Sequence, residues 1–363
     1  MPSRSSPIAW RWWRAVPLAD IAERVWYGTS PVARIARTAL SPLSALYGRV
    51  IARINDQYDG ATPAAGSIPA ISIGNLTVGG TGKTPVSAWF AAQLAAAGAN
   101  PAIVLRGYGD DEVQVHRLLN PGLRIVADTQ RVRGVAQAAR DGADIAILDD
   151  AFQHRRAARV ADIVLLSADR WTSEARLLPA GPFREPLESL RRASLVLVTV
   201  KAADDARVRA TVAAARAATD SPVVTVDLQP TSFVNVGSGE VGGLDAWRGA
   251  RVLAVSGIGD PNAFAAQLQC LGLRSQARVF PDHHAFSALD VSRIMQEGSA
   301  FDAVVCTLKD AVKLGPLWPG SARPLWYLSQ SVVPRDGVDA LDAVIQAVRQ
   351  ARRNGPSSPD LSR

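Results

Sequence analysis

The chain has 363 residues, of which 48% are hydrophobic and 20% charged, so it is long enough for two compact domains with ordinary packed cores. Its net charge is +7, and residues 1–54, with eight arginines against two carboxylates, account for +6 of it. The rest is almost neutral. This distribution argues against a nucleic-acid groove in the globular part and predicts a basic attachment segment at the N-terminus.

The two cysteines and the hydropathy pattern restrict the compartment and the mode of membrane contact. Cys270 and Cys306 show no metal-ligand or CxxC spacing, which favours a reduced protein on the cytoplasmic side. No run of eighteen apolar residues is present, and the N-terminus lacks the apolar stretch of a secretion signal. We therefore expect a chain that can lie on a membrane without crossing it.

Residues 8–54 have the pattern of amphipathic helices, with breaks expected near Pro17, Pro31 and Pro42. Four of the nine tryptophans lie here among the arginines, a combination that suits the headgroup zone of a bilayer. We interpret residues 1–60 as a membrane-associating helical segment. A helical pair packed on its own domain is the alternative.

From residue 68 onward, short apolar runs alternate with helical stretches, which is typical of a parallel sheet covered by helices. The predicted fold class is α/β: a P-loop NTPase-like parallel sheet in residues 61–228, with a smaller second α/β domain. Strands are expected at 70–73, 101–105, 124–127, 145–148, 163–166, 195–200 and 223–227, and helices at 85–97, 129–141 and 204–218.

The C-terminal part repeats this alternation on a smaller scale. A strand and turn from residue 251, a helix at 261–271 and a strand at 303–307 predict a domain over residues 251–350. Residues 229–250 are interpreted as the connection between the domains. The polar residues 351–363 are expected to form a disordered tail.

A phosphate-binding loop follows the first predicted strand, in the sequence GNLTVGGTGKTP at residues 74–85. Glycines allow backbone N–H groups to surround phosphate oxygens, a lysine reaches the terminal phosphates, and a threonine hydroxyl binds Mg²⁺. The first glycine of the usual spacing is replaced by Thr77. A glycine turn without a ligand is the alternative. The residues predicted to bind ATP are Thr77, Val78, Gly79, Gly80, Thr81, Gly82, Lys83 and Thr84.

Two adjacent carboxylates, Asp149 and Asp150, follow the apolar run IAIL at the expected end of a strand. Open α/β sheets place ligands at this edge, and carboxylates there are the expected Mg²⁺ partners of a nucleotide. A solvated acidic turn is the alternative. We predict a magnesium site formed by Thr84, Asp149 and Asp150.

Only four basic residues are lysines, Lys83, Lys201, Lys309 and Lys313, against 36 arginines. In a chain so strongly biased toward arginine, a lysine in a motif position carries extra weight, although neutral drift is an alternative explanation.

The chain resembles the tetraacyldisaccharide 4'-kinase family, the lipid A 4'-kinases of Gram-negative bacteria, over roughly residues 8–345, and six motifs in one order carry the resemblance. They are GNLTVGGTGKTP, RGYG, LDDAFQHRR, GPFREP, FPDHHAFS and TLKDAVKL. The family's phosphate loop shares the irregular first position. The resemblance implies transfer of the γ-phosphate of ATP to the 4'-hydroxyl of an acylated glucosamine disaccharide 1-phosphate. It also implies a peripheral enzyme at the cytoplasmic face of the inner membrane. Neither a nucleic acid nor an obligate protein partner is expected.

The resemblance further implies a catalytic pair, an aspartate from a GDEP stretch and the first histidine of DHH. The histidine matches His283. The aspartate is placed at Asp111, with Asp110 as the competing register, because this chain has GDDEVQV and a shortened loop. A carboxylate that accepts the proton of a sugar hydroxyl fits this chemistry. The substrate-side residues implied are Arg106, Tyr108, Glu112, Arg131, Gln153, His154, Arg184, Glu185, Asp282 and Lys309.

Two other functions are compatible with a phosphate loop. A GTPase or metal-insertion factor requires a guanine-recognition box, which the TLKD sequence at residues 307–310 resembles apart from its first position. A membrane-bound nucleotide switch is expected to hydrolyse ATP without a sugar acceptor.

Overall fold

The computed structural model describes residues 18–107, 110–282 and 284–354. Its strands form one sheet in the order β10-β9-β11-β12-β7-β6-β5-β1-β4-β2-β3, with β8 paired to β7. The strands are β1 (Ala70–Asn75), β2 (Pro101–Leu105), β3 (Arg124–Ala127), β4 (Ile145–Asp149), β5 (Ala161–Ser167), β6 (Leu195–Val200), β7 (Val223–Asn235), β8 (Val241–Gly243), β9 (Arg251–Ser256), β10 (Arg274–Val279), β11 (Ala303–Thr307) and β12 (Leu325–Pro334).

Helices follow most of these strands. They are α1 (Leu18–Tyr27), α2 (Pro31–Asp59), α3 (Lys83–Ala96), α4 (Asp110–Leu119), α5 (Arg131–Arg140), α6 (Asp205–Ala218), α7 (Pro261–Cys270), α8 (Ala288–Gly298), α9 (Leu308–Leu314) and α10 (Val338–Asn354). Short 3-10 turns lie at η1 (Leu187–Arg192), η2 (Leu244–Trp247) and η3 (Gly315–Leu317).

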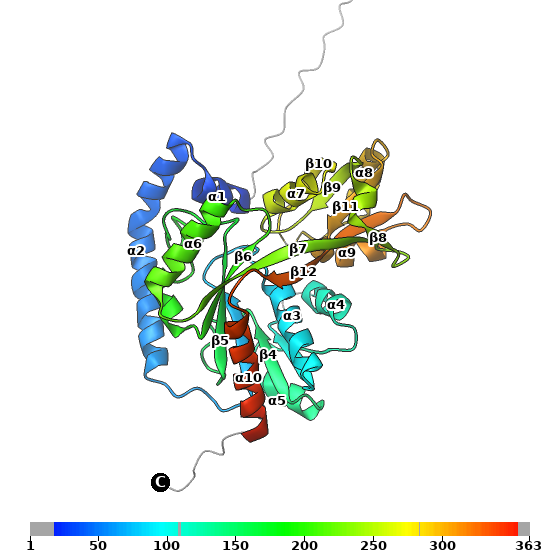
Figure 1. The fold of residues 1–363 in the computed structure, drawn as a ribbon. Helices are drawn as coiled ribbons and strands as arrows, with labels where there is room; N and C mark the ends of the chain where they lie inside the picture. The colour runs from blue at the N-terminus through cyan, green and yellow to red at the C-terminus, as the bar shows by residue number, and fades with distance from the viewer. Residues whose placement is uncertain (1–17, 108–109, 283, 355–363) are drawn as a thin grey trace, which may run out of the picture.

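Two parallel portions of the sheet meet at an antiparallel pair formed by the long strands β7 and β12 (Figure 1). We call β1–β6 with α3–α6 and α10 the first lobe, and β9–β11 with α7–α9 the second lobe. Pairing is parallel within each lobe, as the β1/β4, β1/β5 and β9/β11 registers show. The carboxyl ends of the first-lobe strands therefore lie at one edge, which is where the phosphate loop begins.

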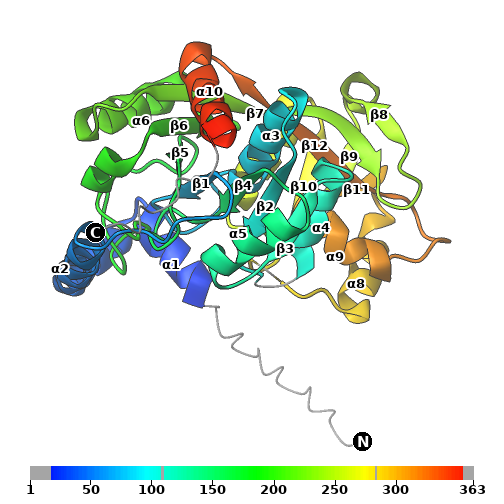
Figure 2. The ribbon, with the colours of Figure 1, turned by 90° about the horizontal axis from the view of Figure 1, so that it is seen from below.

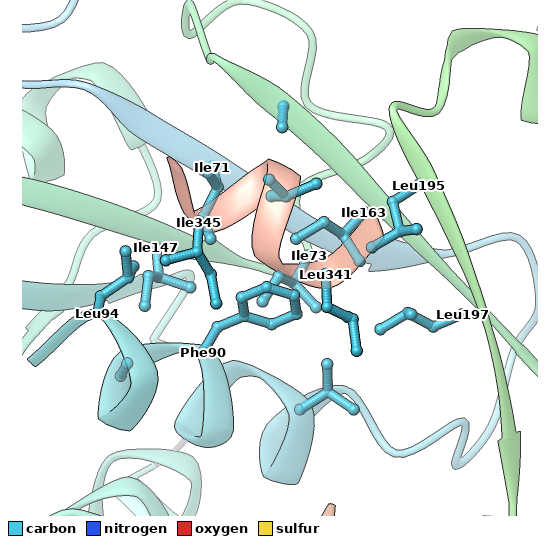
Figure 3. Close-up of a cluster of buried hydrophobic side chains, with 14 of the residues drawn as sticks. Ile71, Ile73, Phe90, Leu94, Ile147, Ile163, Leu195, Leu197, Leu341 and Ile345 are labelled. Carbon is cyan, nitrogen blue, oxygen red and sulfur yellow. The ribbon is translucent and has the colours of Figure 1, made fainter. Parts of the chain in front are cut away.

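The core of the first lobe follows from alternation along its strands. Ile71 and Ile73 point to the face covered by α3 and α10, whereas Ala70 faces α5 on the other side. Phe90 of α3 is fully buried among these isoleucines and Leu341 of α10 (Figure 3). Parallel strands covered on both faces explain the nearly continuous apolar runs in the sequence.

The N-terminal helices lie on the first lobe, with α2 along the flank opposite the second lobe (Figures 1 and 2). The hydroxyl of Ser44 donates to the carbonyl of Leu177 at 2.9 Å and accepts from the amide of Ala180 at 3.0 Å. Tyr47 donates to the carbonyl of Arg184 at 2.9 Å. These bonds fix α2 to the loop that leads to η1.

The break expected near Pro42 is wrong, because α2 continues through this residue. A proline inside a helix removes one backbone hydrogen bond and costs about 3 kcal/mol. The hydrogen bonds of Ser44 and Tyr47, which follow this proline within one or two turns, hold the helix on the first lobe. A helix with the length and apolar character needed to cross a membrane does not occur within residues 18–107, 110–282 and 284–354.

The predicted α/β class, parallel sheet and N-terminal helices are confirmed, while individual bounds differ. The strand expected at 223–227 continues to Asn235, because β7 pairs with β12 beyond the first lobe. The residues assigned to a connection thus begin inside a strand. Helix α10 runs through Asn354, past the expected end of the second domain at residue 350. Residues 355–363 of the expected tail lie outside the described residues, and the domain boundaries themselves stay a prediction.

Candidate active site

The phosphate loop connects β1 to α3 at the carboxyl edge of the sheet. Gly79 and Gly82 have φ angles of 107° and 86°, in the left-handed region that favours glycine. A Cβ at Gly82 would also lie 2.5 Å from Cδ1 of Leu228. Position 82 therefore needs glycine for two independent reasons, its backbone conformation and the contact with Leu228. The turn directs the amino end of α3 toward the cleft between the lobes.

Lys83 begins α3 and points toward the acidic end of β4. Its Nζ lies 3.3 Å from Oδ1 of Asn75 and 3.7 Å from Oδ1 of Asp150. The hydroxyl of Thr81 is buried and has no hydrogen-bond partner among the described residues. The loop thus carries one positioned cation and one uncompensated buried hydroxyl.

Asp149 ends β4 and is held by two side chains from neighbouring helices. Ser87 of α3 donates to its Oδ1 at 3.0 Å, and Nε2 of His116 in α4 lies 3.1 Å from its Oδ2. The guanidinium of Arg131 donates to the carbonyl of Asp149 at 2.9 Å. The carboxylate is therefore fixed in orientation before any ligand binds.

Asp150 follows with a φ of 48°, an unusual conformation for a residue other than glycine. Burial by itself would raise the pKa of its carboxyl, but the positive charges of Lys83 and Arg184 outweigh it and lower this pKa to about 2. The guanidinium of Arg184 donates to Oδ1 of Asp150 at 3.1 Å. Asp150 is thus ionised at neutral pH and holds two cations beside the loop.

A cleft of about 680 Å³ opens from the phosphate loop toward the second lobe. Ile258, Gly259, Phe264, Asp282 and Lys309 line it from the second-lobe side. The sequence-predicted residues that line it are Thr77, Val78, Gly79, Gly80, Thr81, Gly82, Lys83, Thr84, Arg106, Glu112, Arg131, Asp149, Asp150, Gln153, His154, Arg184, Asp282 and Lys309.

Several of these groups have perturbed acidity. Burial, and then the negative charge of Asp149, raise the pKa of Glu112. Burial, and then the positive charges of Arg131 and Arg106, lower the pKa of His154. Such shifts are common where charged groups gather in a functional cleft.

Two predicted residues lie outside the cleft lining. Asp111 forms an ion pair with Lys313 of α9, at 3.3 Å, at the junction of the lobes. Glu185 is buried and accepts hydrogen bonds from Arg192 at 2.7 Å and Asn55 at 3.1 Å, which joins α2 to η1. Tyr108, His283 and the side chain of Asp110 lie outside the described residues.

The cleft includes residues that the sequence motifs did not predict. Lys201, after β6, lines the cleft with its Nζ 3.3 Å from the carbonyl of Gly80. Gln267 donates to the carbonyl of Leu228 at 2.9 Å, and Gln330 donates to Gln267 at 2.6 Å. The scarcity of lysine was the available signal for Lys201.

All four lysines of the chain border this region: Lys83, Lys201 and Lys309 line the cleft, and Lys313 pairs with Asp111. His116 had no comparable signal, because its contact with Asp149 depends on how α4 packs against α3 and β3.

The TLKD sequence forms the start of α9 and does not present its aspartate to the cleft. Asp310 is fully buried, and its Oδ2 accepts from the amide of Gly257 at 3.0 Å and the hydroxyl of Thr307 at 2.6 Å. Guanine recognition needs a carboxylate that faces the ligand. This geometry speaks against the GTPase alternative.

The donor set at the loop fits Mg²⁺. Within the described residues no group of three or more His, Cys, Asp or Glu side chains gathers as a metal cage. Magnesium in nucleotide sites instead takes one or two carboxylates, with phosphates and water completing an octahedron. The hydroxyl of Thr84 and the oriented carboxylate of Asp149, both in the cleft lining, are donors of that kind.

A strand-loop-helix phosphate site, a carboxylate pair at the end of the adjacent strand and a cationic cleft define a P-loop phosphotransferase of the α/β class. The family model described as tetraacyldisaccharide-1-P 4'-kinase matches residues 36–349, and the chain belongs to this family. It is a kinase.

Curated relatives and a solved structure agree with this assignment. A tetraacyldisaccharide 4'-kinase of Anaeromyxobacter dehalogenans strain 2CP-1 is 35% identical over 93% of each chain. The enzyme of that name from Pseudomonas entomophila is 34% identical over 87% of this chain and 93% of its own length. The crystal structure of LpxK from Aquifex aeolicus in complex with ATP is similar with a TM-score of 0.67 and 27% identity, covering 86% of this chain and 99% of that chain.

Proposed function

We propose that the protein transfers the γ-phosphate of ATP to the 4'-hydroxyl of a tetraacylated glucosamine disaccharide 1-phosphate, a late step of lipid A biosynthesis. One observation carries the proposal: a phosphate loop faces a paired carboxylate and a cationic cleft between two lobes, in a chain that matches the kinase family over most of its length.

ATP would bind with its phosphates at the loop. The backbone N–H groups of residues 79–84, which line the cleft, would surround phosphate oxygens, and Lys83 would offset the charge on the β and γ phosphates. Thr84 and Asp149 would hold Mg²⁺, with Asp150 beside it. When bound, the ion supplies positive charge to the transferring phosphoryl group. Ser87 and His116 keep the Asp149 carboxylate aligned for this role.

The acceptor hydroxyl needs a base. Asp111 is proposed to take the proton, with His283 orienting it. The new bond joins the 4'-oxygen to the γ-phosphorus, the bond to the β-phosphate oxygen breaks, and ADP leaves with the electron pair. The ion pair with Lys313 holds the Asp111 carboxylate at the junction of the lobes. The next residue in the chain, Glu112, lines the cleft.

The cations around the cleft would neutralise the anionic substrates. Arg106, Arg184 and Lys309 line it alongside His154, whose depressed pKa favours a neutral imidazole that can donate and accept hydrogen bonds. An Asp282 carboxylate 3.5 Å from Lys309 orients that lysine. Tyr108, Gln153 and Glu185 stay predicted substrate-side residues.

We propose that the protein docks peripherally on the cytoplasmic face of the inner membrane through α2. Exposed apolar side chains recur on one face of this helix at three-, four- and eight-residue spacings. The exposed Arg34, Arg49 and Arg53 add positive charge that attracts anionic lipid. The apolar residues are Val32, Ile35, Leu43, Leu46, Val50 and Ile54.

Transfer of labelled γ-phosphate to an acylated disaccharide 1-phosphate in detergent micelles tests the activity. We expect acceptor-dependent ADP release with ATP and little with GTP. Equal use of GTP would favour the GTPase alternative, and ADP release without acceptor would favour the nucleotide switch.

The same assay tests the placement of the catalytic pair. Asp111→Asn and His283→Ala should each lower transfer by about 10² or more, in the range of general-base catalysis. Asp110→Asn is the matched control for the register. A loss with Asp110→Asn but not with Asp111→Asn would move the base by one residue and leave the kinase activity in place.

A further inference from the structure

Arg170 lies in the loop after β5, and its guanidinium is almost completely buried between three separate elements. It donates to the carboxylate of Glu23 at 2.5 Å and to the hydroxyl of Tyr27 at 3.2 Å, both in α1. It also stacks over the ring of Tyr27, 4.3 Å from its centroid. On its other side it donates to the carbonyl of Gly259 in the second lobe.

The same guanidinium packs against the phosphate loop. A Cβ placed on Gly79 would lie 3.3 Å from Nε of Arg170. A Cβ placed on Gly259 would lie 3.0 Å from the amide nitrogen of Gly80 and 3.1 Å from Cα of Gly79. The second-lobe loop therefore sits directly on the phosphate loop, and Arg170 closes the contact from the side of α1.

A second cation completes this junction. Lys201 of the first lobe reaches Oδ2 of Asp260 at 3.9 Å and the carbonyl of Gly80 at 3.3 Å. Asp260 is buried, and this Oδ2 has no hydrogen-bond partner among the described residues. Gly79 and Gly80 of the phosphate loop thus lie between two first-lobe cations, Arg170 and Lys201, and the second-lobe loop that contains Gly259.

We propose that Arg170 is a positioning residue that couples helix α1 to the nucleotide site. Its guanidinium is anchored on α1 and holds the Gly259 loop, which connects β9 to α7, against the phosphate loop. The proposal rests on the proposed function only in taking ATP as the ligand of the loop. Because α1 and the Gly259 loop share one buried cation, a change that makes α1 more mobile also makes the phosphate loop more mobile. A nucleotide that orders the phosphate loop correspondingly orders α1. Thermodynamic reciprocity requires the two effects to be equal in free energy.

Burial gives the anchor its strength. An exposed arginine-carboxylate pair contributes little, but here the Arg170 side chain is only 8% exposed, against 40% for Glu23, so loss of the carboxylate leaves a buried guanidinium uncompensated. Burial is also the largest influence on the Glu23 carboxyl and raises its pKa, and the Arg170 charge opposes that rise. Removing either partner should therefore disturb the other.

The test compares ATP affinity, measured by calorimetry on the full chain, among Arg170→Met, Arg170→Lys and Glu23→Gln. Glu23 contacts Arg170 from α1, so Glu23→Gln perturbs the junction from the α1 side. We expect ATP to bind about fivefold or more weakly to all three variants, the lower end of typical coupling strengths. In transfer assays KM for ATP should rise more than kcat falls.

The matched control is the pair Asp144 and Arg352, joined at 2.8 Å at the amino end of β4 and away from the loop. Asp144→Asn and Arg352→Met should leave ATP affinity unchanged. Hydrogen exchange provides a readout that a purely structural role would not move. ATP should slow amide exchange in residues 18–27 of the wild type and not in Arg170→Met or Glu23→Gln.

Wild-type ATP affinity in Glu23→Gln overturns the proposal, as does equal slowing of exchange in the wild type and Arg170→Met. If Arg170→Met does not fold, Arg170→Lys and Glu23→Gln decide. A wild type that binds ATP with the expected exchange response but phosphorylates no disaccharide would refute the proposed function and leave the coupling intact.

Discussion

At the scale of single residues, the charges around the phosphate loop form a network rather than isolated pairs. Asp150 contacts Lys83 and Arg184 at once, while Asn75 accepts from both of these cations. Because each cation already has acidic and amide partners, it is positioned before nucleotide binds, which lowers the reorganisation needed during phosphoryl transfer.

Lys83→Met should lower kcat for γ-phosphate transfer by about 10² to 10³, the usual cost of losing one charge-stabilising group in an active site. The labelled-phosphate assay measures it. Arg352→Met, which breaks a remote ion pair, should keep wild-type kcat. Near-normal transfer by Lys83→Met would remove this lysine from the machinery.

The depressed pKa of Asp150 predicts a pH dependence of stability. The folded-state pKa of about 2 lies below the ordinary aspartate pKa of 3.8, so the ionised carboxylate stabilises the fold above about pH 4 and this contribution disappears as pH falls toward 2. The side chain is 44% exposed, so the contribution should stay below about 1 kcal/mol.

Urea unfolding of the wild type and Asp150→Asn at intervals from pH 2 to 5 measures this dependence. The difference in unfolding free energy should shrink as the pH falls. A difference that is constant across this range would contradict the assignment of the low pKa to Asp150.

At the scale of elements, α2 combines an anchored inner face with an apolar outer face. Ser44 and Tyr47 bind the loop before η1, while side chains such as Ile35 and Leu46 stay exposed. A helix with tertiary contacts on one side and exposed leucine and isoleucine on the other is suited to an interfacial position.

Replacing Ile35, Leu43 and Leu46 together by serine should weaken binding to vesicles of anionic phospholipid by about tenfold or more, given the apolar area lost. Vesicle sedimentation measures the effect. The matched control replaces three exposed apolar residues outside α2, at positions 241, 289 and 338, by serine. Equal loss in both variants would mean that α2 has no special part in docking.

At the scale of the whole molecule, the antiparallel pairing of β7 and β12 makes one sheet of two parallel halves and sets the cleft at their junction. Side chains from both halves line that cleft, including Lys83 from the first lobe and Lys309 from the second. The phosphate loop leads directly into α3, which packs on the strands of the first lobe. The stability of the site is therefore expected to depend on this core.

Phe90→Ala should lower the free energy of unfolding by about 3 to 5 kcal/mol, because it opens a cavity among fully buried side chains. Urea denaturation followed by circular dichroism measures it. Leu118→Ala, at a position 52% exposed in α4, is the control and should change stability by less than about 0.5 kcal/mol. A small effect at Phe90 would mean that the helix repacks.

The phosphate loop, the Asp149–Asp150 pair and the α/β alternation could all be predicted from the amino-acid sequence. These features depend on local order along the chain: a strand, a glycine turn and a helix follow one another, and strand ends share an edge in any parallel sheet. The motifs of the C-terminal half were visible for the same reason, since each is a contiguous segment.

Contacts between residues that are distant in the sequence could not be predicted, because they depend on how the elements pack in three dimensions. The contacts of Lys201 with Gly80, of His116 with Asp149 and of Arg170 with α1 join residues far apart in sequence, and no local pattern encodes them. The burial of Asp310 beside Gly257 and the continuation of α2 through Pro42 were likewise not predicted. In both cases long-range packing and hydrogen bonding outweighed the local preference of the sequence.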